Sequence, residues 1–284
     1  MHVQSYHTFV APLAMLGALH QRIPYVLTFH GGGHSSRIRN SLRGTQIAML
    51  SPLLKRAERL VAIARFEIAT FSRLTGIPAE KFVLIPNGAD LPQIEHNGNR
   101  PAEDGVLIAS VGRLERYKGH QRILAALPEI LERRPDARLW IAGSGPYERE
   151  LLHMAKRLNV ADRVEIHAIP PNERQRMANE LSRASLMVLL SEYETHPLAV
   201  LEALSLNVPA LVADTSGLHE IAERGWARAV PVDSPPEKVA AAVLQQLDHP
   251  VRPETLDFYR WDDCAADLLK LYQEILSRRV ACAS

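Results

Sequence analysis

Short apolar runs alternate with longer amphipathic stretches along most of the chain. The runs have the length of strands and are apolar at nearly every position, as strands are when helices cover both faces of their sheet. The predicted strands are residues 25–29, 60–64, 82–85, 106–111, 137–142, 164–168, 186–190, 209–213 and 229–232. The amphipathic stretches predict helices, among them residues 121–133, 148–158, 173–182, 198–206 and 236–247. This alternation is typical of an α/β fold with parallel sheets.

A polar stretch interrupts the alternation and predicts a boundary between two domains. Residues 91–104 have no apolar period and contain prolines, glycine and asparagines, as interdomain linkers do. We therefore expect an incomplete α/β domain over residues 1–92, a linker over 93–104 and a nearly complete α/β domain over 105–250. The last residues, 251–284, contain an amphipathic helix that is expected to cross back to the first domain.

The composition is that of a folded protein without a bulk affinity for nucleic acid. Hydrophobic residues make up 46% of the 284 residues, and 33 Lys and Arg nearly balance 32 Asp and Glu. Cys264 and Cys282 have no metal-ligand spacing, and so few cysteines suit the reducing cytoplasm. The first residues lack a signal-peptide pattern, and no apolar run approaches the roughly 20 residues of a membrane span. We expect a cytoplasmic protein whose membrane contact, if any, is peripheral at the inner face.

The basic residues are concentrated in the first third of the chain. Residues 1–90 contain ten Lys or Arg and only four Asp or Glu. Such a lobe either meets anionic lipid or a phosphate-bearing substrate, or is an ordinary solvated basic face. The same two interpretations apply to residues 37–59, which predict a helix resting on an anionic membrane or a solvated basic helix. The residues concerned are Arg37, Arg39, Arg43, Lys55, Arg56 and Arg59, around Ile47, Met49, Leu50, Leu53 and Leu54.

The segment after the strand 106–111 has residues that suit a phosphate. In open α/β sheets, ligands bind beyond the C-terminal ends of the strands, often against helix N-termini. The segment reads Gly112-Arg-Leu-Glu-Arg-Tyr-Lys-Gly119. Gly112 permits a tight turn, while Arg113 and Lys118 offer a bidentate fork and a point charge that suit a diphosphate. The alternative is two ordinary surface cations in a loop.

A helix with a carboxylate on each side of its start is predicted after the strand 186–190. Pro197 suits the first helical position, so that Thr195 or His196 would be the N-cap. Glu194 then lies in the loop, and Glu202 lies about a turn and a half into the helix.

This helix start offers a seat for an anion. The amides of Leu198 and Ala199 would point out of the helix, and Glu194 and Glu202 would accept hydrogen bonds from sugar hydroxyls on either side. A ligand with hydroxyls at both ends and phosphates between them is a nucleotide sugar. The alternative is that both acids only stabilise the helix through its dipole.

Taken in order, these segments and several others resemble the family 4 glycosyltransferases, which have the GT-B fold. The matching blocks are Thr28-Phe-His-Gly31, Ile85-Pro-Asn-Gly-Ala-Asp90, Val111 to Gly119, Ile141-Ala-Gly-Ser-Gly-Pro146, the E-x7-E pair Glu194 and Glu202, and Gly217-Leu-His-Glu220. The resemblance implies two Rossmann-like parallel-sheet domains that face a cleft. The family's first strand, glycine-rich turn and helix are not found in this sequence. We therefore expect the N-terminal domain to be incomplete, through a misplaced start or a truncated gene.

The resemblance also implies roles for individual donor-binding residues. Arg113 and Lys118, which follow Gly112 in the G-R-L-x-x-x-K-G block, would hold the donor diphosphate. Glu194 would contact the transferred sugar, and Glu202 would bind the ribose hydroxyls.

This chain departs from the family's E-G-F-G-L pattern, because it has Glu194-Thr-His-Pro-Leu198. Pro197 has no N–H, so one donor is lost, and the amides of Leu198 and Ala199 are expected to remain available. His196 either compensates or, as we expect, caps the helix at the surface.

The family's T-x-H histidine lies near the sugar and corresponds to His30, which would bind a sugar hydroxyl or the reacting region. Residues 31–36, rich in glycine, are expected to be flexible backbone near the acceptor. They are not a Walker-type loop, since no Gly-Lys-Ser/Thr follows.

The implied reaction is transfer of a sugar from a UDP- or GDP-sugar to a glycan or lipid-linked acceptor, with retention at the anomeric carbon. Arg113, Lys118 and the helix dipole would stabilise the charge that develops on the diphosphate. No D-x-D element is present, so we expect neither a metal nor a cofactor. Two alternatives stay open: a sugar-nucleotide epimerase of the same architecture, and a non-catalytic remnant that binds nucleotide sugars.

Overall fold

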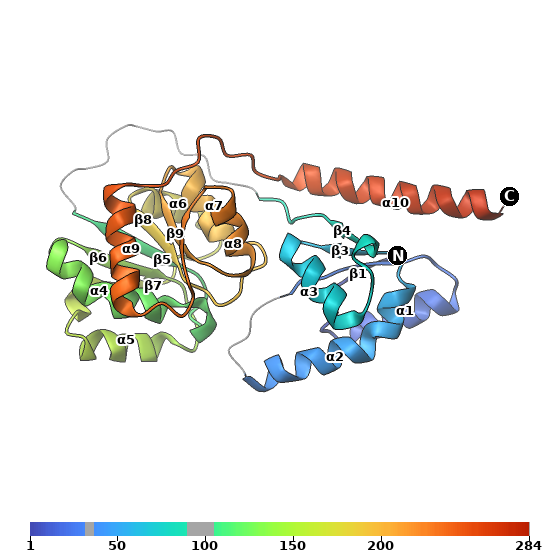
Figure 1. The fold of residues 1–284 in the computed structure, drawn as a ribbon, viewed down its shortest axis with the longest axis horizontal. Coiled ribbons are helices and arrows are strands. Elements are labelled where there is room, and N and C mark those ends of the chain that lie inside the picture. The colour runs from blue at the N-terminus through green and yellow to red at the C-terminus, as the bar shows by residue number, and fades with distance from the viewer. Residues whose placement is uncertain (32–36, 90–104, 284) are drawn as a thin grey trace. The chain divides into compact units, whose positions relative to one another are not determined.

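The computed structural model describes residues 1–31, 37–89 and 105–283, except for the side chains of residues 37–43, 280, 282 and 283 (Figure 1). By their contacts, the residues form two compact units. Unit 1 comprises Met1–Asp90 and Asp257–Ser284, and unit 2 comprises Leu91–Leu256. The C-terminal segment thus belongs to the same unit as the first 90 residues. The linker expected at residues 93–104 lies outside the described residues.

Unit 1 is built on a four-stranded parallel sheet with the strand order β1-β2-β3-β4. The strands are β1 (His2–Gln4), β2 (Val26–Thr28), β3 (Arg59–Ala62) and β4 (Phe82–Leu84), and the register aligns Gln4 with Thr28. The helices that connect them are α1 (Val10–His20), α2 (Arg37–Arg56), α3 (Arg65–Thr75) and the 3-10 turn η1 (Ala79–Lys81). Parallel neighbours need such crossover connections, which explains why a helix follows each of the first three strands.

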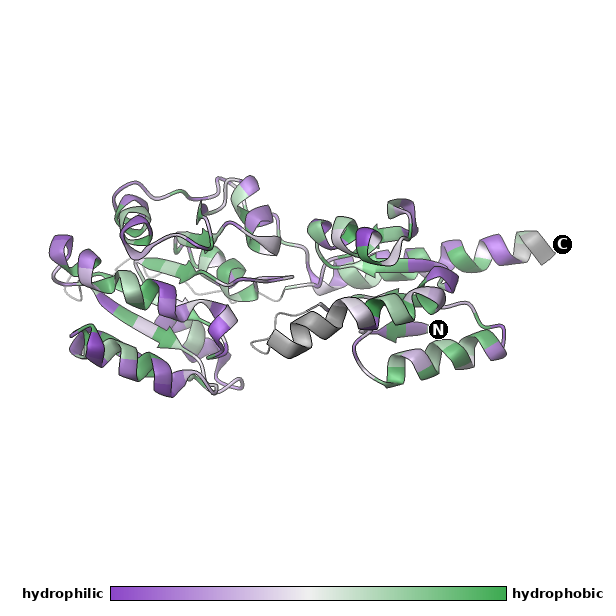
Figure 2. Ribbon diagram, turned by 60° about the horizontal axis from the view of Figure 1, so that its bottom comes forward, coloured by the Kyte–Doolittle hydropathy of each residue, from purple (hydrophilic) through white to green (hydrophobic). Residues whose placement is uncertain are grey.

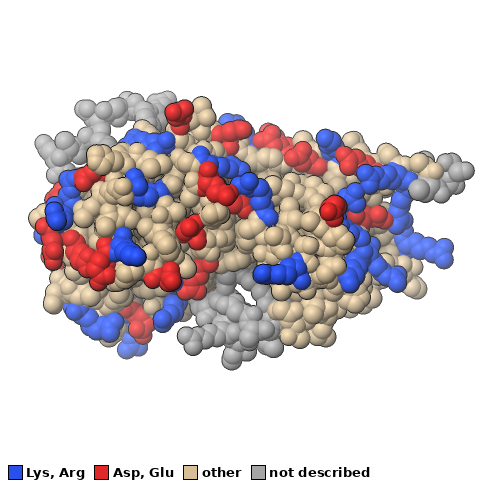
Figure 3. Space-filling view, viewed as in Figure 1, with Lys and Arg blue, Asp and Glu red and all other residues tan. Residues whose placement is uncertain are grey.

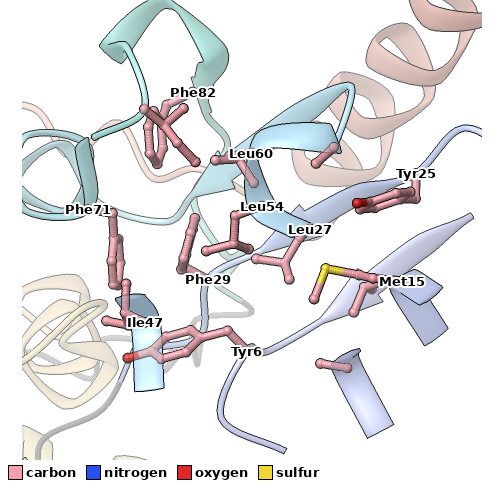
Figure 4. Close-up of a cluster of buried hydrophobic side chains, with 14 of the residues drawn as sticks. Tyr6, Met15, Tyr25, Leu27, Phe29, Ile47, Leu54, Leu60, Phe71 and Phe82 are labelled. Carbon is pink, nitrogen blue, oxygen red and sulfur yellow. The ribbon is translucent and has the colours of Figure 1, made fainter. Parts of the chain in front are cut away.

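The two faces of this sheet carry separate apolar clusters. On one face, aromatic side chains of the strands and helices pack together, with the rings of Phe29 and Phe71 stacked at 4.0 Å between centroids (Figure 4). On the other face, Val26 and Val61 pack against Leu271 of α10 (Trp261–Ala283). The C-terminal helix therefore supplies the second layer that a buried parallel sheet requires.

Four of the five apolar residues of α2 that were considered for a membrane contact lie in the core of unit 1. Ile47 and Leu54 are fully buried, and Leu50 and Leu53 pack against the same cluster. Met49 is the exposed exception among the five apolar residues considered for a membrane contact. The expectation that these residues rest on a membrane is therefore wrong for four of them, because the sheet already covers them. Arg37, Arg39 and Arg43 lie outside the described side chains.

Unit 2 is built on a six-stranded parallel sheet with the strand order β10-β9-β8-β5-β6-β7. Its strands are β5 (Leu107–Val111), β6 (Arg138–Ala142), β7 (Val164–His167), β8 (Leu186–Leu189), β9 (Ala210–Ala213) and β10 (Arg228–Val230). Its helices are α4 (His120–Arg133), α5 (Glu148–Arg157), α6 (Arg174–Ser182), α7 (Leu198–Ser205), α8 (Ser216–Glu223) and α9 (Pro236–Asp248), with the 3-10 turns η2 (Arg116–Lys118) and η3 (Ala161–Arg163). All nine strands predicted from the apolar runs are present, within one or two residues of the expected bounds.

Figure 2 shows largely hydrophobic strands in both sheets and helices with both hydrophobic and hydrophilic residues. This is the pattern expected when the helices are the outer layers. Among the described helices, none is both long enough and apolar enough to cross a membrane.

Candidate functional site

The strand order of unit 2 reverses between β5 and β8, and this point of reversal brings two candidate loops together. The chain passes from β5 to β6 and β7 on one side, then crosses to β8, β9 and β10 on the other. In open parallel sheets, such a switch point leaves a crevice at the C-terminal strand ends. The loop of residues 112–119 follows β5, and the loop of residues 190–197 follows β8. The two loops are hydrogen-bonded, since the Glu192 amide donates to the Tyr117 carbonyl at 2.7 Å.

Gly119 allows these loops to touch. Its φ of +79° is in the left-handed region, and a Cβ atom here would lie 1.9 Å from the Leu190 carbonyl oxygen. No side chain fits at that distance, so another residue at position 119 would push the two loops apart.

Lys118 and Glu194 form an ion pair in this crevice. Lys118 Nζ lies 2.7 Å from Glu194 Oε1, and their side chains are only 16% and 10% exposed. The Ser191 hydroxyl donates to the same carboxylate oxygen at 2.7 Å. The other oxygen, Oε2, has no donor among the described residues, so it is the one that remains for a ligand hydroxyl.

The start of α8 holds the backbone of Glu194 in place. The Glu194 amide donates to Ser216 Oγ at 2.9 Å, and the Gly217 amide donates to the Glu194 carbonyl at 2.8 Å. Ser216 stands where the expected G-G-x-x-E pattern has its first glycine, and it has a φ of +50°. Ser216 therefore has a backbone conformation that is strained for a residue other than glycine, and it contributes a hydroxyl that glycine lacks. Ser191 and Ser216 were both missed from the sequence, because nothing in their spacing indicates that they contact Glu194.

Arg113 lies in the same loop as Lys118 but makes different contacts. Its guanidinium is paired with Glu115 at 2.8 Å and donates to the Tyr117 hydroxyl at 2.6 Å, while its side chain stays 66% exposed. Lys118 Nζ lies 5.4 Å from the centre of the Tyr117 ring. Both cations thus lie near the buried Tyr117, Arg113 at its hydroxyl and Lys118 near its ring, and burial raises the pKa of that hydroxyl.

A buried histidine supports the turn at Gly112 and Arg113. His120 Nε2 lies 3.3 Å from the Arg113 carbonyl oxygen, and Nδ1 lies 2.8 Å from Ser110 Oγ. A carbonyl only accepts, so Nε2 carries the proton and Nδ1 accepts from the serine hydroxyl. Burial lowers the pKa of His120 to about 4, which keeps the ring neutral. The sequence did not single out this residue, which directly follows Gly119.

Glu202 lies in a pocket of its own within unit 2. The pocket has a volume of about 140 Å³ and lies between α6, α7 and the segment after β7, with Arg174 as its only basic residue among the described residues. Its apolar wall consists of Ile169, Pro170, Pro171, Met177, Ala178 and Leu181. Burial raises the pKa of Glu202, and the charge of Arg174 partly opposes this shift. Its carboxylate makes no hydrogen bond within the described residues.

The start of α7 differs from the expectation in three ways. The helix begins at Leu198, so Pro197 precedes the first helical residue, and no side chain caps this end. Pro197 has φ −80° and ψ 70°, and the Leu198 amide donates back to the His196 carbonyl at 2.9 Å. This is an inverse γ-turn, which occupies the Leu198 amide that was expected to be available. The Ala199 amide has no acceptor among the described residues.

His196 is not the surface cap that we expected. Its Nε2 is buried and has no hydrogen-bond partner among the described residues, and burial lowers the pKa of the ring to about 4. The neutral ring therefore packs into unit 2, in the position where the expected pattern has phenylalanine.

His30 belongs to unit 1 and follows β2. Its Nε2 lies 2.6 Å from Gln4 Oε1, and burial lowers its pKa, with a further contribution from His7. Residues 32–36, expected to be flexible backbone near an acceptor, lie outside the described residues.

Comparison with known proteins assigns both parts of the chain to one group of enzymes. The family model described as "Glycosyl transferases group 1" matches residues 93–258, and the one described as "Glycosyltransferase Family 4" matches residues 1–93. A glycogen synthase of Mycobacterium tuberculosis is 28% identical over 253 residues, which are 87% of this chain and 60% of that protein. A GDP-mannose-dependent phosphatidylinositol dimannoside mannosyltransferase of the same species is 30% identical over 210 residues, which are 68% of this chain and 52% of that protein. The chain thus spans about half to 60% of the length of these relatives.

Solved structures show the same fold. Sucrose-phosphate synthase from Thermosynechococcus elongatus superposes with a TM-score of 0.77 at 20% identity, over 98% of this chain and 73% of that one. HepE from Anabaena, solved in complex with UDP and glucose, superposes with a TM-score of 0.75 at 16% identity, over 96% of this chain and 77% of that one. These similarities and the two parallel sheets confirm the expected GT-B fold.

Proposed function

Because the chain belongs to the glycosyl transferases group 1 family, with the GT-B fold, we propose that it transfers a sugar from a nucleoside-diphosphate sugar to a glycan or lipid-linked acceptor. The observation that carries this proposal is the Lys118–Glu194 pair at the switch point, 2.7 Å between charged atoms. It combines a cation for phosphate with a carboxylate for sugar hydroxyls in one crevice. Several fold neighbours are described with UDP or a sugar bound, which supports this donor class.

The proposed donor orientation follows from the contacts around this pair. Lys118 has three N–H donors, and one of them is used by Glu194. The other two, with the exposed guanidinium of Arg113 and the Ala199 amide at the start of α7, would hold the diphosphate. Glu194 Oε2 would accept from the hydroxyls of the transferred sugar. All these groups belong to unit 2.

The pocket beside Glu202 would take the nucleoside. Its apolar wall suits a base, and the Glu202 carboxylate suits the ribose hydroxyls. The carboxylate would gain hydrogen-bond donors from these hydroxyls when the nucleoside binds. Burial already raises the pKa of this carboxyl group, as expected for a group that lacks partners without its ligand.

We further propose that the reaction proceeds with retention and without a metal. The positive charges of Lys118 and Arg113 and the α7 dipole would stabilise the leaving diphosphate, the task that a metal performs in other transferases. The expected result is unchanged activity after dialysis against EDTA. An EDTA-sensitive activity that is restored by Mg²⁺ or Mn²⁺ would contradict this point.

One experiment tests donor binding and turnover together. A thermal-shift screen of UDP- and GDP-sugars is expected to identify a stabilising donor, with loss of the shift in Glu202→Ala. Product analysis with that donor then separates transfer from the alternatives: epimerised donor indicates an epimerase, and binding without turnover indicates a non-catalytic protein. No stabilisation by any nucleotide sugar would refute the proposal.

We also propose that the protein acts in the cytoplasm, with peripheral contact to the inner face of the membrane. The basic residues of unit 1, some of which gather on the face drawn in Figure 3, support attraction to anionic lipid. The name of one relative, which includes phosphatidylinositol dimannoside, is consistent with a lipid-linked acceptor. Flotation with anionic vesicles at low salt is expected to carry the protein upward, and failure to float would exclude the contact.

A further inference from the structure

A chain of polar side chains crosses the sheet of unit 1 and ends at His30. His2 and Gln4 project from the same side of β1, because residues two apart in a strand share a face. His2 Nδ1 lies 2.5 Å from the Tyr272 hydroxyl of α10, and its Nε2 lies 2.7 Å from Thr28 Oγ1. These contacts fix the His2 ring between the sheet and the C-terminal helix.

Gln4 connects this fixed ring to His30. Its amide nitrogen faces the His2 ring at 3.3 and 3.4 Å, and its amide oxygen lies 2.6 Å from His30 Nε2. The backbone of Gln4 is held as well, since β1 pairs it with Thr28 of β2. The amide thus has its nitrogen toward the His2 ring and its oxygen toward His30 Nε2.

The amide oxygen determines where His30 carries its proton. An amide oxygen only accepts, so Nε2 of His30 must donate, and in the neutral ring Nδ1 then has the free lone pair. Burial lowers the pKa of His30, and the neighbouring His7 acts in the same direction, so both disfavour a second proton on the ring. Nδ1 has no partner among the described residues.

We propose that Gln4 is a positioning residue that holds His30 in the Nε2–H tautomer, so that Nδ1 accepts a hydrogen bond from a hydroxyl of the acceptor. This inference rests on the proposed transferase function. It assigns to Gln4 a role through His30 and no contact with substrate.

The test has a spectroscopic arm that does not depend on activity. In ¹⁵N-histidine-labelled protein, the His30 ring signals are assigned by their absence in His30→Gln. At pH 7.5, the expected pattern is a protonated Nε2 and an unprotonated Nδ1 in the wild type. Gln4→Leu is expected to shift His30 to a mixture of tautomers, whereas Tyr272→Phe, at the far end of the chain, leaves His30 in the Nε2–H form. A wild-type His30 with its proton on Nδ1, or a Gln4→Leu spectrum that matches the wild type, would overturn the inference.

The kinetic arm asks whether this tautomer matters for the reaction. Gln4→Leu is expected to lower kcat about tenfold with little change in the donor KM, because the donor contacts lie in unit 2. Gln4→Glu keeps an acceptor at the same place and is expected to restore kcat at high pH. Its carboxylate raises the pKa of His30, so the acid limb of the pH profile should move to higher pH.

The two arms separate this inference from the proposed function. A shifted tautomer with unchanged kcat would refute the positioning role and leave the transferase proposal intact. Absence of any transfer by the wild type would refute the proposed function, while the spectra still decide the tautomer. Equal melting temperatures of Gln4→Leu and wild type ensure that lost activity does not arise from unfolding.

Discussion

Replacing Lys118 by methionine tests whether the Lys118–Glu194 pair is a true buried ion pair. The substitution keeps the length of the side chain and leaves Glu194 with Ser191 as its remaining donor. For charges 2.7 Å apart, the gross attraction is about 6 kcal/mol at an effective dielectric constant of about 20. Desolvation offsets much of this, and with side chains 16% and 10% exposed we expect Lys118→Met to lower the free energy of unfolding of unit 2 by about 2–3 kcal/mol.

A double-mutant cycle separates the pair from the side effects of each substitution. Glu194→Gln alone leaves a buried ammonium, whereas the double variant leaves no unpaired charge. The double variant should therefore be more stable than the sum of the single effects predicts, with a coupling energy of about 2 kcal/mol. Hydrogen–deuterium exchange in increasing urea, read at the amides of β5 and β8, reports on unit 2 separately from unit 1.

The matched control is the exposed pair Arg176–Glu173 in the same unit. Its atoms are 2.8 Å apart, but the side chains are 57% and 39% exposed. Because solvent screens such a pair, we expect a much smaller coupling energy than that of the Lys118–Glu194 pair. Equal coupling in the two cycles, or additive effects at Lys118 and Glu194, would refute the reasoning that burial strengthens the pair.

The remaining predictions concern the loops, the pH dependence and the pocket. Gly119→Ala is expected to lower the free energy of unfolding by at least about 3 kcal/mol, because its Cβ would lie 1.9 Å from a carbonyl oxygen. The control Gly76→Ala has the same type of φ but open space around the Cβ, and should lower it by about 1 kcal/mol. The melting temperatures of the two variants measure this difference. The pKa of His120 is lowered from 6.5 to about 4, so the unfolded state binds more protons in this window and the free energy of unfolding should fall as pH decreases from 6.5 to 4. His120→Gln should flatten this slope in urea titrations, and an unchanged slope would contradict the assignment. Glu202→Gln is expected to stabilise the unliganded protein by about 1 kcal/mol at pH 7, because burial disfavours its carboxylate, while weakening nucleotide-sugar binding in calorimetry. Tighter binding by this variant would exclude the proposed role in holding ribose.

The sequence by itself determined the class of fold and the position of its elements. A strand covered on both faces must be apolar at every position, so the buried strands of both units can be read directly from the apolar runs. The residues at the strand ends, including Arg113, Lys118 and Glu194, could be found in the same way, because ligands of parallel sheets bind there. Strand β1 gave no such signal, because His2 and Gln4 are polar and leave no apolar run.

The tertiary structure decided which of these residues touch. The ion pair joins positions 118 and 194 because β5 and β8 are neighbours, and the strand order depends on how the crossovers pack and not on the local pattern. For the same reason, the contacts of Ser191, Ser216 and His120 with the candidate site had no counterpart in the sequence.

The burial of α2 and the turn at Pro197 also depended on the fold. An apolar stripe on a helix predicts that something covers it, but only the structure shows that the sheet of unit 1 does so. The γ-turn removes the Leu198 amide through a hydrogen bond between residues two apart, a backbone choice that the residue types permit without requiring. Sequence periodicity reports whether each residue is buried, whereas its partner depends on the path of the whole chain.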